Sequence, residues 1–204
     1  MISTVIFDMD GTLYDTERIY RMAWLEAGVP LAVYQQFIGT GASTVRRIIE
    51  ENGLQVMQIL RDANAVTQRE LAKGIPLKPG AKEVLAWLRE KGYRTGIATS
   101  STIETAQRYL TNTHMTDYFD EVISGNTLER GKPYPDIFLM AAQQLGASPE
   151  NCMVVEDSYN GVRAGHAAGM YTVMIPDLVE PDEEITALAD AVLVSLTEVK
   201  KLLQ

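Results

Sequence analysis

Short apolar segments recur along the chain, and polar residues follow most of them. The first segment, residues 4–7, is β-branched and aromatic, does not alternate between polar and apolar positions, and stops at Asp8. A strand that is apolar on both faces is typical of a parallel sheet covered on both sides. Similar segments follow at residues 94–98, 121–123, 152–155 and 171–175, with a weaker sixth at 191–194.

Helical patterns separate these apolar segments. Residues 81–91 follow Pro79-Gly80 and precede Gly92, and residues 136–145 follow Pro135 and precede Gly146. Proline is common at the start of a helix, and glycine is common just after its end. Strands that alternate with helices at this interval indicate an α/β fold. We therefore expect a Rossmann-like parallel sheet of about six strands flanked by helices.

Residues 15–76 interrupt this alternation. Helical patterns cover residues 15–27, 43–52 and 56–73, and we find no convincing strand among them. We expect two domains: an α/β core made of residues 1–14 and 77–204, and a helical cap made of residues 15–76 inserted after the first strand. Asp15-Thr16 and residues 74–76 are the expected hinges between them, at which the cap could close and exclude water.

Charge and composition narrow the classes of partner. The chain has 18 Lys and Arg against 27 Asp and Glu, a net charge of −9 at pH 7. This balance argues against a basic surface for nucleic acid or for an anionic membrane. We find no apolar run of the ~18 residues that a membrane span needs, and no secretory leader pattern. The single cysteine, Cys152, is expected to be a buried apolar residue, which fits a reduced, cytoplasmic location.

Polar residues follow the predicted strands where a parallel sheet binds ligands, beyond the carboxyl ends of its strands. They are Asp8 to Thr12 after the first strand, Thr99 and Ser100 after the second, Lys132 after the third, and Glu156, Asp157 and Ser158 after the fourth. Four carboxylates, several hydroxyls and one ammonium should therefore meet at one edge. Bunched carboxylates repel one another, and Mg²⁺ is the hard cation that such oxygen ligands favour.

This set of groups suits phosphoryl chemistry. The Thr99 hydroxyl and the Lys132 ammonium could hold phosphate oxygens. An aspartate beside the metal could attack phosphorus to form an acyl phosphate, and a second aspartate two residues on could transfer the proton. Simpler interpretations stay open: Asp8 and Asp10 as helix caps, Thr99 as a turn residue, and Lys132 as a solvated lysine.

Four motifs in order make the chain resemble the haloacid dehalogenase superfamily of phosphohydrolases. They are residues 8–12 (Asp-Met-Asp-Gly-Thr), Thr99, residues 131–136 around Lys132, and residues 156–161 (Glu-Asp-Ser-Tyr-Asn-Gly). The glycines at 161 and 165 are expected to allow tight helix packing behind Asp157. The inserted helical segment is similar to the cap of the β-phosphoglucomutase and phosphoglycolate phosphatase branch. The second aspartate of the first motif argues against dehalogenation, because the dehalogenases lack it.

The resemblance also implies roles for individual residues. Asp8 would be the nucleophile, and Asp10 the general acid and base that binds metal through its backbone carbonyl. Glu156 would be either a second metal ligand or a partner just outside the metal shell. In full, the implied catalytic residues are Asp8 and Asp10, the phosphate-binding residues are Thr99, Ser100 and Lys132, and the metal ligands are Asp8, Asp10, Asp157 and Glu156.

The cap is expected to select the substrate, because the core binds only the phosphate group that all substrates share. The candidate contacts are Arg18, Tyr20, Arg21, Tyr34, the loop at residues 39–42, and Arg46 and Arg47 on the helix after it. β-Phosphoglucomutases carry an arginine shortly after the glycine of that loop, where it grips a second phosphate. Here Ala42 stands at that position, which disfavours a mutase.

The leading hypothesis is a Mg²⁺-dependent phosphatase that hydrolyses a small phosphate monoester, such as a sugar phosphate, through an aspartyl-phosphate. One alternative is a β-phosphoglucomutase-like phosphosugar mutase, and another is a phosphoacceptor module that binds without turnover. The expected partner is a phosphorylated metabolite rather than nucleic acid or membrane. The chain itself is expected to act as a monomer or a weak homo-oligomer.

Overall fold

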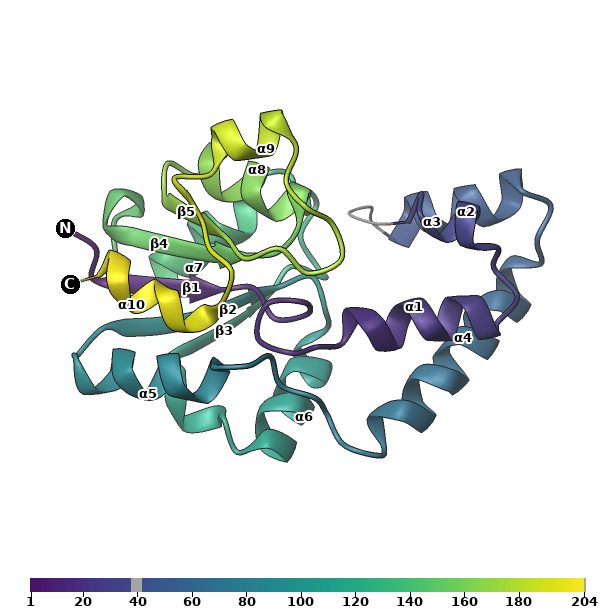
Figure 1. Ribbon diagram of the computed structural model, residues 1–204, viewed down its shortest axis with the longest axis horizontal. Coiled ribbons are helices and arrows are strands. Elements are labelled where there is room, and N and C mark those ends of the chain that lie inside the picture. Colours follow the sequence, from purple (N-terminus) through teal and green to yellow (C-terminus); the bar gives the residue numbers. More distant parts are fainter. Residues whose placement is uncertain (38–41, 204) are drawn as a thin grey trace. The chain divides into compact units, whose positions relative to one another are not determined.

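The computed structural model describes residues 1–37 and 42–203 and divides into two compact units (Figure 1). The larger unit comprises Met1–Tyr14 and Leu77–Gln204, and the smaller one Asp15–Pro76. The chain therefore leaves the larger unit after its first strand and returns to it before its second.

The larger unit contains a six-stranded sheet with the order β3-β2-β1-β4-β5-β6. Every neighbouring pair is parallel, so the predicted α/β fold with a parallel sheet is confirmed. The strands are β1 (Thr4–Phe7), β2 (Arg94–Thr99), β3 (Glu121–Ser124), β4 (Cys152–Glu156), β5 (Tyr171–Met174) and β6 (Ala191–Val192).

Strand ends differ from the predicted ones by a residue or two. β2, β3 and β4 each continue one residue past the apolar run, because backbone pairing extends to Thr99 with Ser124 and to Glu156 with Met174. Backbone pairing does not require an apolar side chain, so apolar runs alone mark strand ends imprecisely. β6 is shorter than predicted: it is an edge strand, and Val194 beyond it is 89% exposed.

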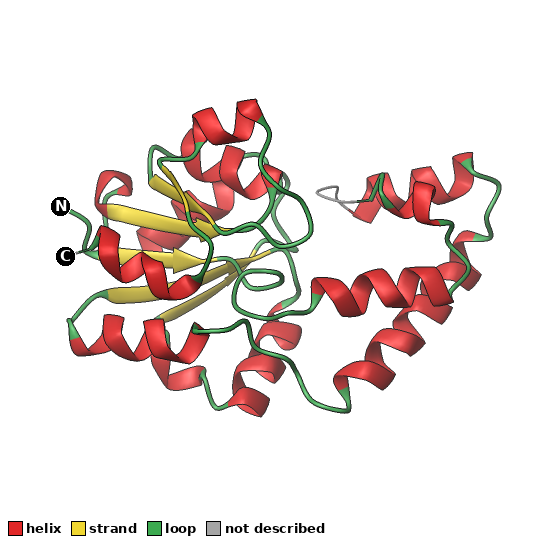
Figure 2. Cartoon of the chain, viewed as in Figure 1, coloured by secondary structure: helices red, strands yellow, loops and turns green. Residues whose placement is uncertain are grey.

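Helices cover both faces of this sheet (Figures 1 and 2). α5 (Ala81–Glu90) and α6 (Ile103–Thr113) lie on one face, and α7 (Asp136–Gln144) and α8 (Tyr159–Ala167) on the other. An apolar cluster joins α7 and α8 to Ile6 and Val154 of the central strands. The remaining helices are α9 (Glu183–Leu188), α10 (Val199–Leu202) and three 3-10 turns at Thr116–Tyr118, Pro149–Asn151 and Leu196–Glu198.

The order of the strands places a switch point between β1 and β4. From β1 the chain proceeds outward to β2 and β3 on one side, and then crosses back to β4 on the other side of β1. Crossovers that diverge from two neighbouring strands leave a crevice beyond their carboxyl ends, which is where open α/β sheets bind ligands. Asp8 directly follows β1, and Glu156 ends β4, so both stand at this crevice.

The described residues of the smaller unit form helices and turns. The helices are α1 (Glu17–Glu26), α2 (Leu31–Tyr34), α3 (Ala42–Glu51) and α4 (Val56–Leu71), and α1 packs along α4. Tyr34 is 4% exposed and its ring packs edge-on against Phe37, so it belongs to this unit's apolar core. It is therefore poorly placed for the substrate contact that the sequence suggested. Arg46 and Arg47 are exposed on α3, and the loop at residues 39–41 lies outside the described residues.

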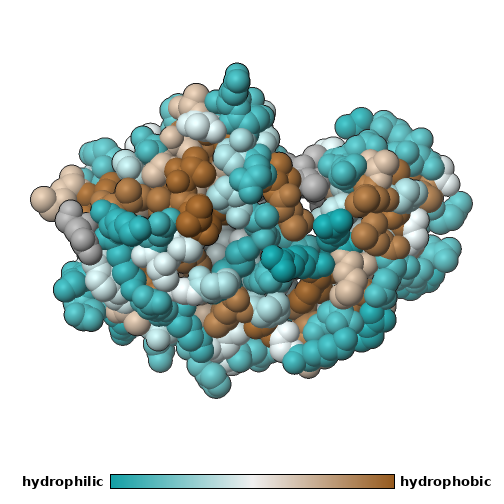
Figure 3. All heavy atoms as spheres, viewed as in Figure 1, coloured by the Kyte–Doolittle hydropathy of each residue, from teal (hydrophilic) through white to brown (hydrophobic). Residues whose placement is uncertain are grey.

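The two connecting segments run side by side within the smaller unit, where the Asp15 N–H donates to the Pro76 carbonyl at 3.0 Å. On the face drawn in Figure 3, each unit shows hydrophilic side chains interspersed with apolar patches. None of the helices described here combines the length and the apolar character needed to cross a bilayer. Cys152 is fully buried, as predicted.

Candidate active site

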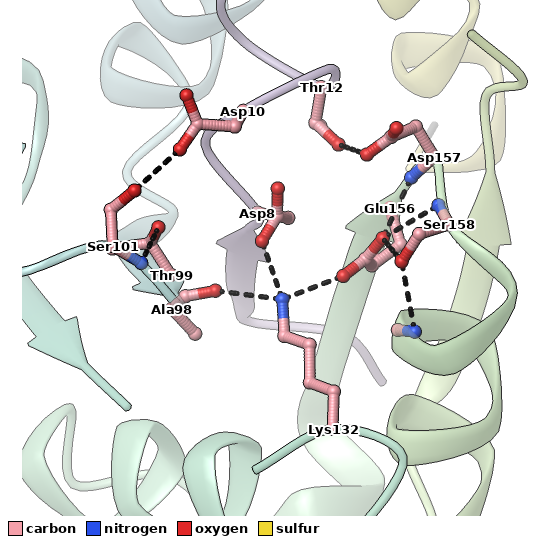
Figure 4. A network of polar contacts seen from close by, with 11 residues as sticks. Asp8, Asp10, Thr12, Ala98, Thr99, Ser101, Lys132, Glu156, Asp157 and Ser158 are labelled. Carbon is pink, nitrogen blue, oxygen red and sulfur yellow. Dashed lines mark hydrogen bonds and ion pairs between the residues drawn. The ribbon is translucent and has the colours of Figure 1, made fainter. Parts of the chain in front are cut away.

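The predicted site residues of the core other than Ser100 meet at the carboxyl edge of the sheet (Figure 4). Asp8 leaves β1 with its N–H still donating to the Val155 carbonyl at 2.9 Å, so the backbone of β4 holds it in place. Thr99 and Glu156 are the last residues of β2 and β4, and Lys132 reaches in from the loop after β3. The edge predicted from the parallel sheet thus carries these side chains as a contiguous cluster.

Lys132 lies at the centre of this cluster. Its Nζ is 2.5 Å from Asp8 Oδ1, 2.6 Å from Glu156 Oε1 and 3.1 Å from the carbonyl oxygen of Ala98. Its side chain is 7% exposed and its ammonium lies 5.0 Å from the centre of the Phe138 ring. The three ammonium protons thus have three acceptors, and Lys132 is a buried charge bridge rather than a solvated lysine.

The buried charges shift each other's pKa. Burial raises the pKa of Asp8 to about 8, Lys132 opposes this rise, and the Glu156 and Asp10 carboxylates add to it. For Lys132, burial alone would lower the pKa, but attraction from Asp8 and Glu156 leaves it above its ordinary value. Lys132 is therefore cationic, yet its charge is shared between two carboxylates. A further cation beside Asp8 would favour the ionised carboxylate.

Glu156 is 1% exposed, and both of its carboxylate oxygens have partners. Oε1 accepts from Lys132, and Oε2 accepts from the backbone N–H of Asp157 and of Ser158 at 2.9 Å and from Ser158 Oγ at 3.0 Å. Ser158 is also the N-cap of α8, since its Oγ accepts from the Gly161 N–H at 3.1 Å. The start of α8 therefore holds one side of Glu156, and Lys132 holds the other.

Two helix glycines allow tight packing here, although against Glu156 and Thr172 rather than against Asp157 as predicted. A Cβ on Gly161 would lie 1.8 Å from the Glu156 carboxylate, and a Cβ on Gly165 would lie 2.8 Å from Thr172 Oγ1. The close contact of Gly161 is thus with Glu156. Side chains larger than hydrogen at position 161 would occupy the space of a buried, hydrogen-bonded carboxylate.

Asp157 is oriented by the loop after β1. The Thr12 hydroxyl donates to Asp157 Oδ1 at 2.9 Å, a contact that the sequence analysis did not assign. Gly11 has φ of +85°, and a Cβ there would lie 2.3 Å from Asp157 Oδ2. Glycine is therefore needed at position 11 for two reasons: the backbone is left-handed there, and Asp157 lies too close for a Cβ.

Three carboxylates of this edge could hold a divalent cation. Asp8, Glu156 and Asp157 each offer an oxygen, and these oxygens lie within 4.8 Å of one another. The donors are all hard oxygens, which suits Mg²⁺. Because Oε2 of Glu156 already accepts three hydrogen bonds, Glu156 could contribute only through Oε1, the oxygen that it shares with Lys132.

Asp10 lies on the other side of the crevice, beside the end of β2. Its Oδ2 accepts from Ser101 Oγ at 2.8 Å, and the Ser101 N–H donates to Thr99 Oγ1 at 3.0 Å. Ser100, the serine predicted from the sequence to bind phosphate, is exposed at this point, and Ser101 was not among the predicted residues. Two adjacent serines after a strand give the same local signal, and only the path of the backbone distinguishes them.

The geometry matches a known family. The family model for haloacid dehalogenase-like hydrolase matches residues 2–169, which include all four motifs. The chain belongs to the haloacid dehalogenase-like hydrolases. The sequence resemblance is thereby confirmed at the level of the superfamily.

Two named relatives of this haloacid dehalogenase-like hydrolase are phosphatases. It is 31% identical over 215 residues to hexitol phosphatase B of Escherichia coli (strain K12), covering 97% of this chain and 94% of that protein. It is 33% identical over 178 residues to a fructose-1-phosphate phosphatase of the same organism, covering 83% and 94%. The solved structure of CbbY from Rhodobacter sphaeroides in complex with phosphate is 26% identical, with a TM-score of 0.76, and covers 98% of this chain and 96% of that one.

Proposed function

We propose that this chain is a Mg²⁺-dependent phosphatase that hydrolyses a small phosphate monoester, in particular a sugar or sugar-alcohol phosphate, through an aspartyl-phosphate on Asp8. The observation that carries the proposal is the position of Asp8. Its carboxylate lies at the switch point of the sheet, 2.5 Å from the Lys132 ammonium and within the three-carboxylate cluster. The names of the two phosphatase relatives support the class of substrate.

In the first step, an Asp8 carboxylate oxygen attacks phosphorus while the bond to the ester oxygen breaks. Asp10 gives its proton to that oxygen, so that an alcohol leaves rather than an alkoxide. Lys132 and the Thr99 hydroxyl offset the charge on the phosphoryl oxygens. The product of this step is an acyl phosphate on Asp8 and the free alcohol.

In the second step, water attacks the phosphorus of the acyl phosphate. Asp10 takes the proton of that water, inorganic phosphate leaves, and the Asp8 carboxylate is restored. Lys132 remains bound to Glu156 throughout, so the ammonium keeps its position while the charge of Asp8 changes. Glu156 thus acts as a positioning residue for Lys132.

Asp8, Asp157 and the backbone carbonyl of Asp10 would hold Mg²⁺, with Glu156 as a fourth contributor through Oε1. When bound, the ion would polarise the phosphoryl group and offset negative charge near Asp8. The helical unit, residues 15–76, is proposed to act as the cap that selects the substrate, with residues 1–14 and 77–204 as the catalytic core. Arg18 and Arg21, both exposed on α1, are its candidate contacts. The cytoplasmic location and the monomeric or weakly associated state stay predictions.

The test is a screen of phosphorylated metabolites with Mg²⁺, scored by phosphate release and ranked by kcat/KM. Asp8→Asn should lose essentially all turnover, because an amide is a poor nucleophile and a weak metal ligand. Asp117→Asn, on an exposed 3-10 turn, is the matched control and should behave as the unmodified chain. Residual activity of Asp8→Asn within about tenfold, only ~1.4 kcal/mol of barrier, would refute the assignment of the nucleophile.

The same screen separates the alternatives. A phosphosugar mutase would convert a sugar phosphate to its isomer without releasing phosphate. A phosphoacceptor module would incorporate phosphate once per chain and stop. Multiple turnovers that release inorganic phosphate are the expected result.

A further inference from the structure

Ser100 and Ser101 are adjacent serines that follow β2, but their side chains lie in different environments. Ser100 is exposed, whereas the Ser101 hydroxyl points toward Asp10 and donates to its Oδ2 at 2.8 Å (Figure 4). Asp10 lies on the loop after β1, so this hydrogen bond joins the ends of two neighbouring strands. A hydroxyl-to-carboxyl hydrogen bond of 2.8 Å has the usual length of an O–H···O hydrogen bond in proteins.

The backbone of Ser101 is anchored on both sides. Its N–H donates to Thr99 Oγ1 at 3.0 Å, and its carbonyl oxygen accepts from Ser124 Oγ at 2.6 Å. Ser124 is the last residue of β3 and pairs in register with Thr99 of β2. The orientation of Ser101 is therefore set by two strands of the sheet, which leaves its hydroxyl directed at Asp10.

Proton transfer from a carboxyl group depends on this kind of anchoring. A general acid must come within about 2.6–3.2 Å of the oxygen that receives its proton. An aspartate side chain that can rotate freely about its own bonds spends part of its time outside that range. A fixed contact on one carboxyl oxygen restricts this rotation and keeps the group within reach of the ester oxygen.

We propose that Ser101 is a positioning residue, which holds the Asp10 carboxyl group in the orientation that protonates the leaving oxygen and then deprotonates the attacking water. The proposal rests on the phosphatase function proposed above. In the first half-reaction the Asp10 proton moves to the ester oxygen as the phosphorus–oxygen bond breaks and Asp8 bonds to phosphorus. In the second, a water proton moves to Asp10 as the water oxygen bonds to phosphorus and Asp8 is released. Ser101 keeps its own proton in both.

The test compares Ser101→Ala with Ser101→Thr, which keeps a hydroxyl at the same position. Rapid-quench measurement of aspartyl-phosphate formation uses two probes, p-nitrophenyl phosphate and the alkyl sugar phosphate with the highest kcat/KM in the screen. p-Nitrophenolate needs little protonation and a sugar alkoxide needs much, so only a defect in proton transfer distinguishes the probes. General acid–base catalysis accelerates a reaction by about 10²–10⁴-fold. With the sugar phosphate, we expect the rate of aspartyl-phosphate formation to fall by roughly tenfold to thirtyfold in Ser101→Ala.

With p-nitrophenyl phosphate, the loss in the formation step should stay within about threefold, and Ser101→Thr should recover most of the rate with both probes. In an Asp10→Asn background, Ser101→Ala should have no further effect, because the group that it positions is gone. Urea unfolding curves of each variant show that the changes are not caused by loss of the fold.

Several outcomes would overturn the proposal: equal loss with both leaving groups, full additivity with Asp10→Asn, no loss in Ser101→Ala, or no recovery in Ser101→Thr. Failure of the proposed function has a different signature. It shows in the unmodified chain, as absence of phosphate release from every ester, or as unchanged turnover in Asp8→Asn. Either of those results would remove the basis of the Ser101 proposal as well.

Discussion

Replacing Gly161 by alanine should disrupt the buried ion pair from a position that bears no functional group. The new Cβ would lie 1.8 Å from the Glu156 carboxylate, whereas ordinary van der Waals contact begins at 3.4 Å, so the carboxylate and the helix start must move apart by about the difference of these two distances. Its hydrogen bonds to Lys132, to two backbone N–H groups and to Ser158 Oγ measure 2.6–3.0 Å. A displacement of that size would break at least one of them, and the carboxylate, which is 1% exposed, is too buried for solvent to replace the lost bond.

The magnitude follows from these contacts. Breaking a buried ion pair costs about 3–5 kcal/mol, and alanine in place of a helical glycine returns about 1 kcal/mol. The free energy of unfolding, measured by urea denaturation, should therefore fall by roughly 3 kcal/mol. The value of kcat/KM with p-nitrophenyl phosphate should fall by at least about tenfold, since Lys132 loses its fixed position beside Asp8.

Asn160→Ala is the matched control, because it changes helix propensity in the same turn of α8 without filling the space of Glu156. A second variant tests the steric argument directly. Glu156→Asp shortens the side chain by one methylene and so makes room for the new Cβ. In the double variant, the losses in the free energy of unfolding caused by the two substitutions should therefore be less than additive. A Gly161→Ala chain that keeps its activity and unfolds within about 0.5 kcal/mol of the unmodified chain would refute the reasoning.

Three further predictions concern a second buried ion pair, the single cysteine and the metal site. Lys78 and Asp177 form an ion pair at 2.6 Å, and the Asp177 side chain is 2% exposed. Lys78→Met should thus cost about 3 kcal/mol in urea unfolding, while Lys82→Met, exposed on α5, should cost less than ~0.5 kcal/mol. Burial raises the pKa of the Cys152 thiol from 9.0 to about 11. At pH 8 the thiolate fraction should therefore be about a hundredfold lower than in the unfolded chain. A thiol reagent should label the native chain far more slowly than the chain in urea. Phosphate release should stop in excess chelator and return when Mg²⁺ is added. Ca²⁺ should restore it poorly, because its larger and looser coordination shell would misplace the in-line attack. Full turnover in the metal-free chain would contradict the metal site.

The sequence by itself determined the fold class and the edge at which chemistry could occur. Apolar runs such as residues 4–7 can be buried only between two layers, and helices between them require a parallel sheet. Parallel strands end at the same edge, so Asp8 after β1 and Asp157 after β4 had to lie at one edge of the sheet, and the strand order of the structure then makes them neighbours. These inferences need only strand direction and the residue that follows each strand.

The tertiary structure decided what each polar side chain contacts. Ser101 rather than Ser100 faces Asp10, because Thr99 and Ser124 orient its backbone. Tyr34 lies in the core of its own unit instead of at a surface. Sequence spacing carries no information on such choices, because they depend on side-chain direction and on neighbours from distant strands.

The environment of Glu156 is a further example of what only the tertiary structure decided. The motif predicts an acidic residue at the metal edge, but the hydrogen bonds to its oxygens come from the two residues just before α8 and from Lys132, 24 residues earlier in the chain. The need for glycine at position 161 follows from the same contact, since the helix start approaches the carboxylate too closely for a Cβ. Strand order brings residues to one edge of the sheet, and packing at that edge then decides which of them can bind an ion, move a proton or only support a neighbour.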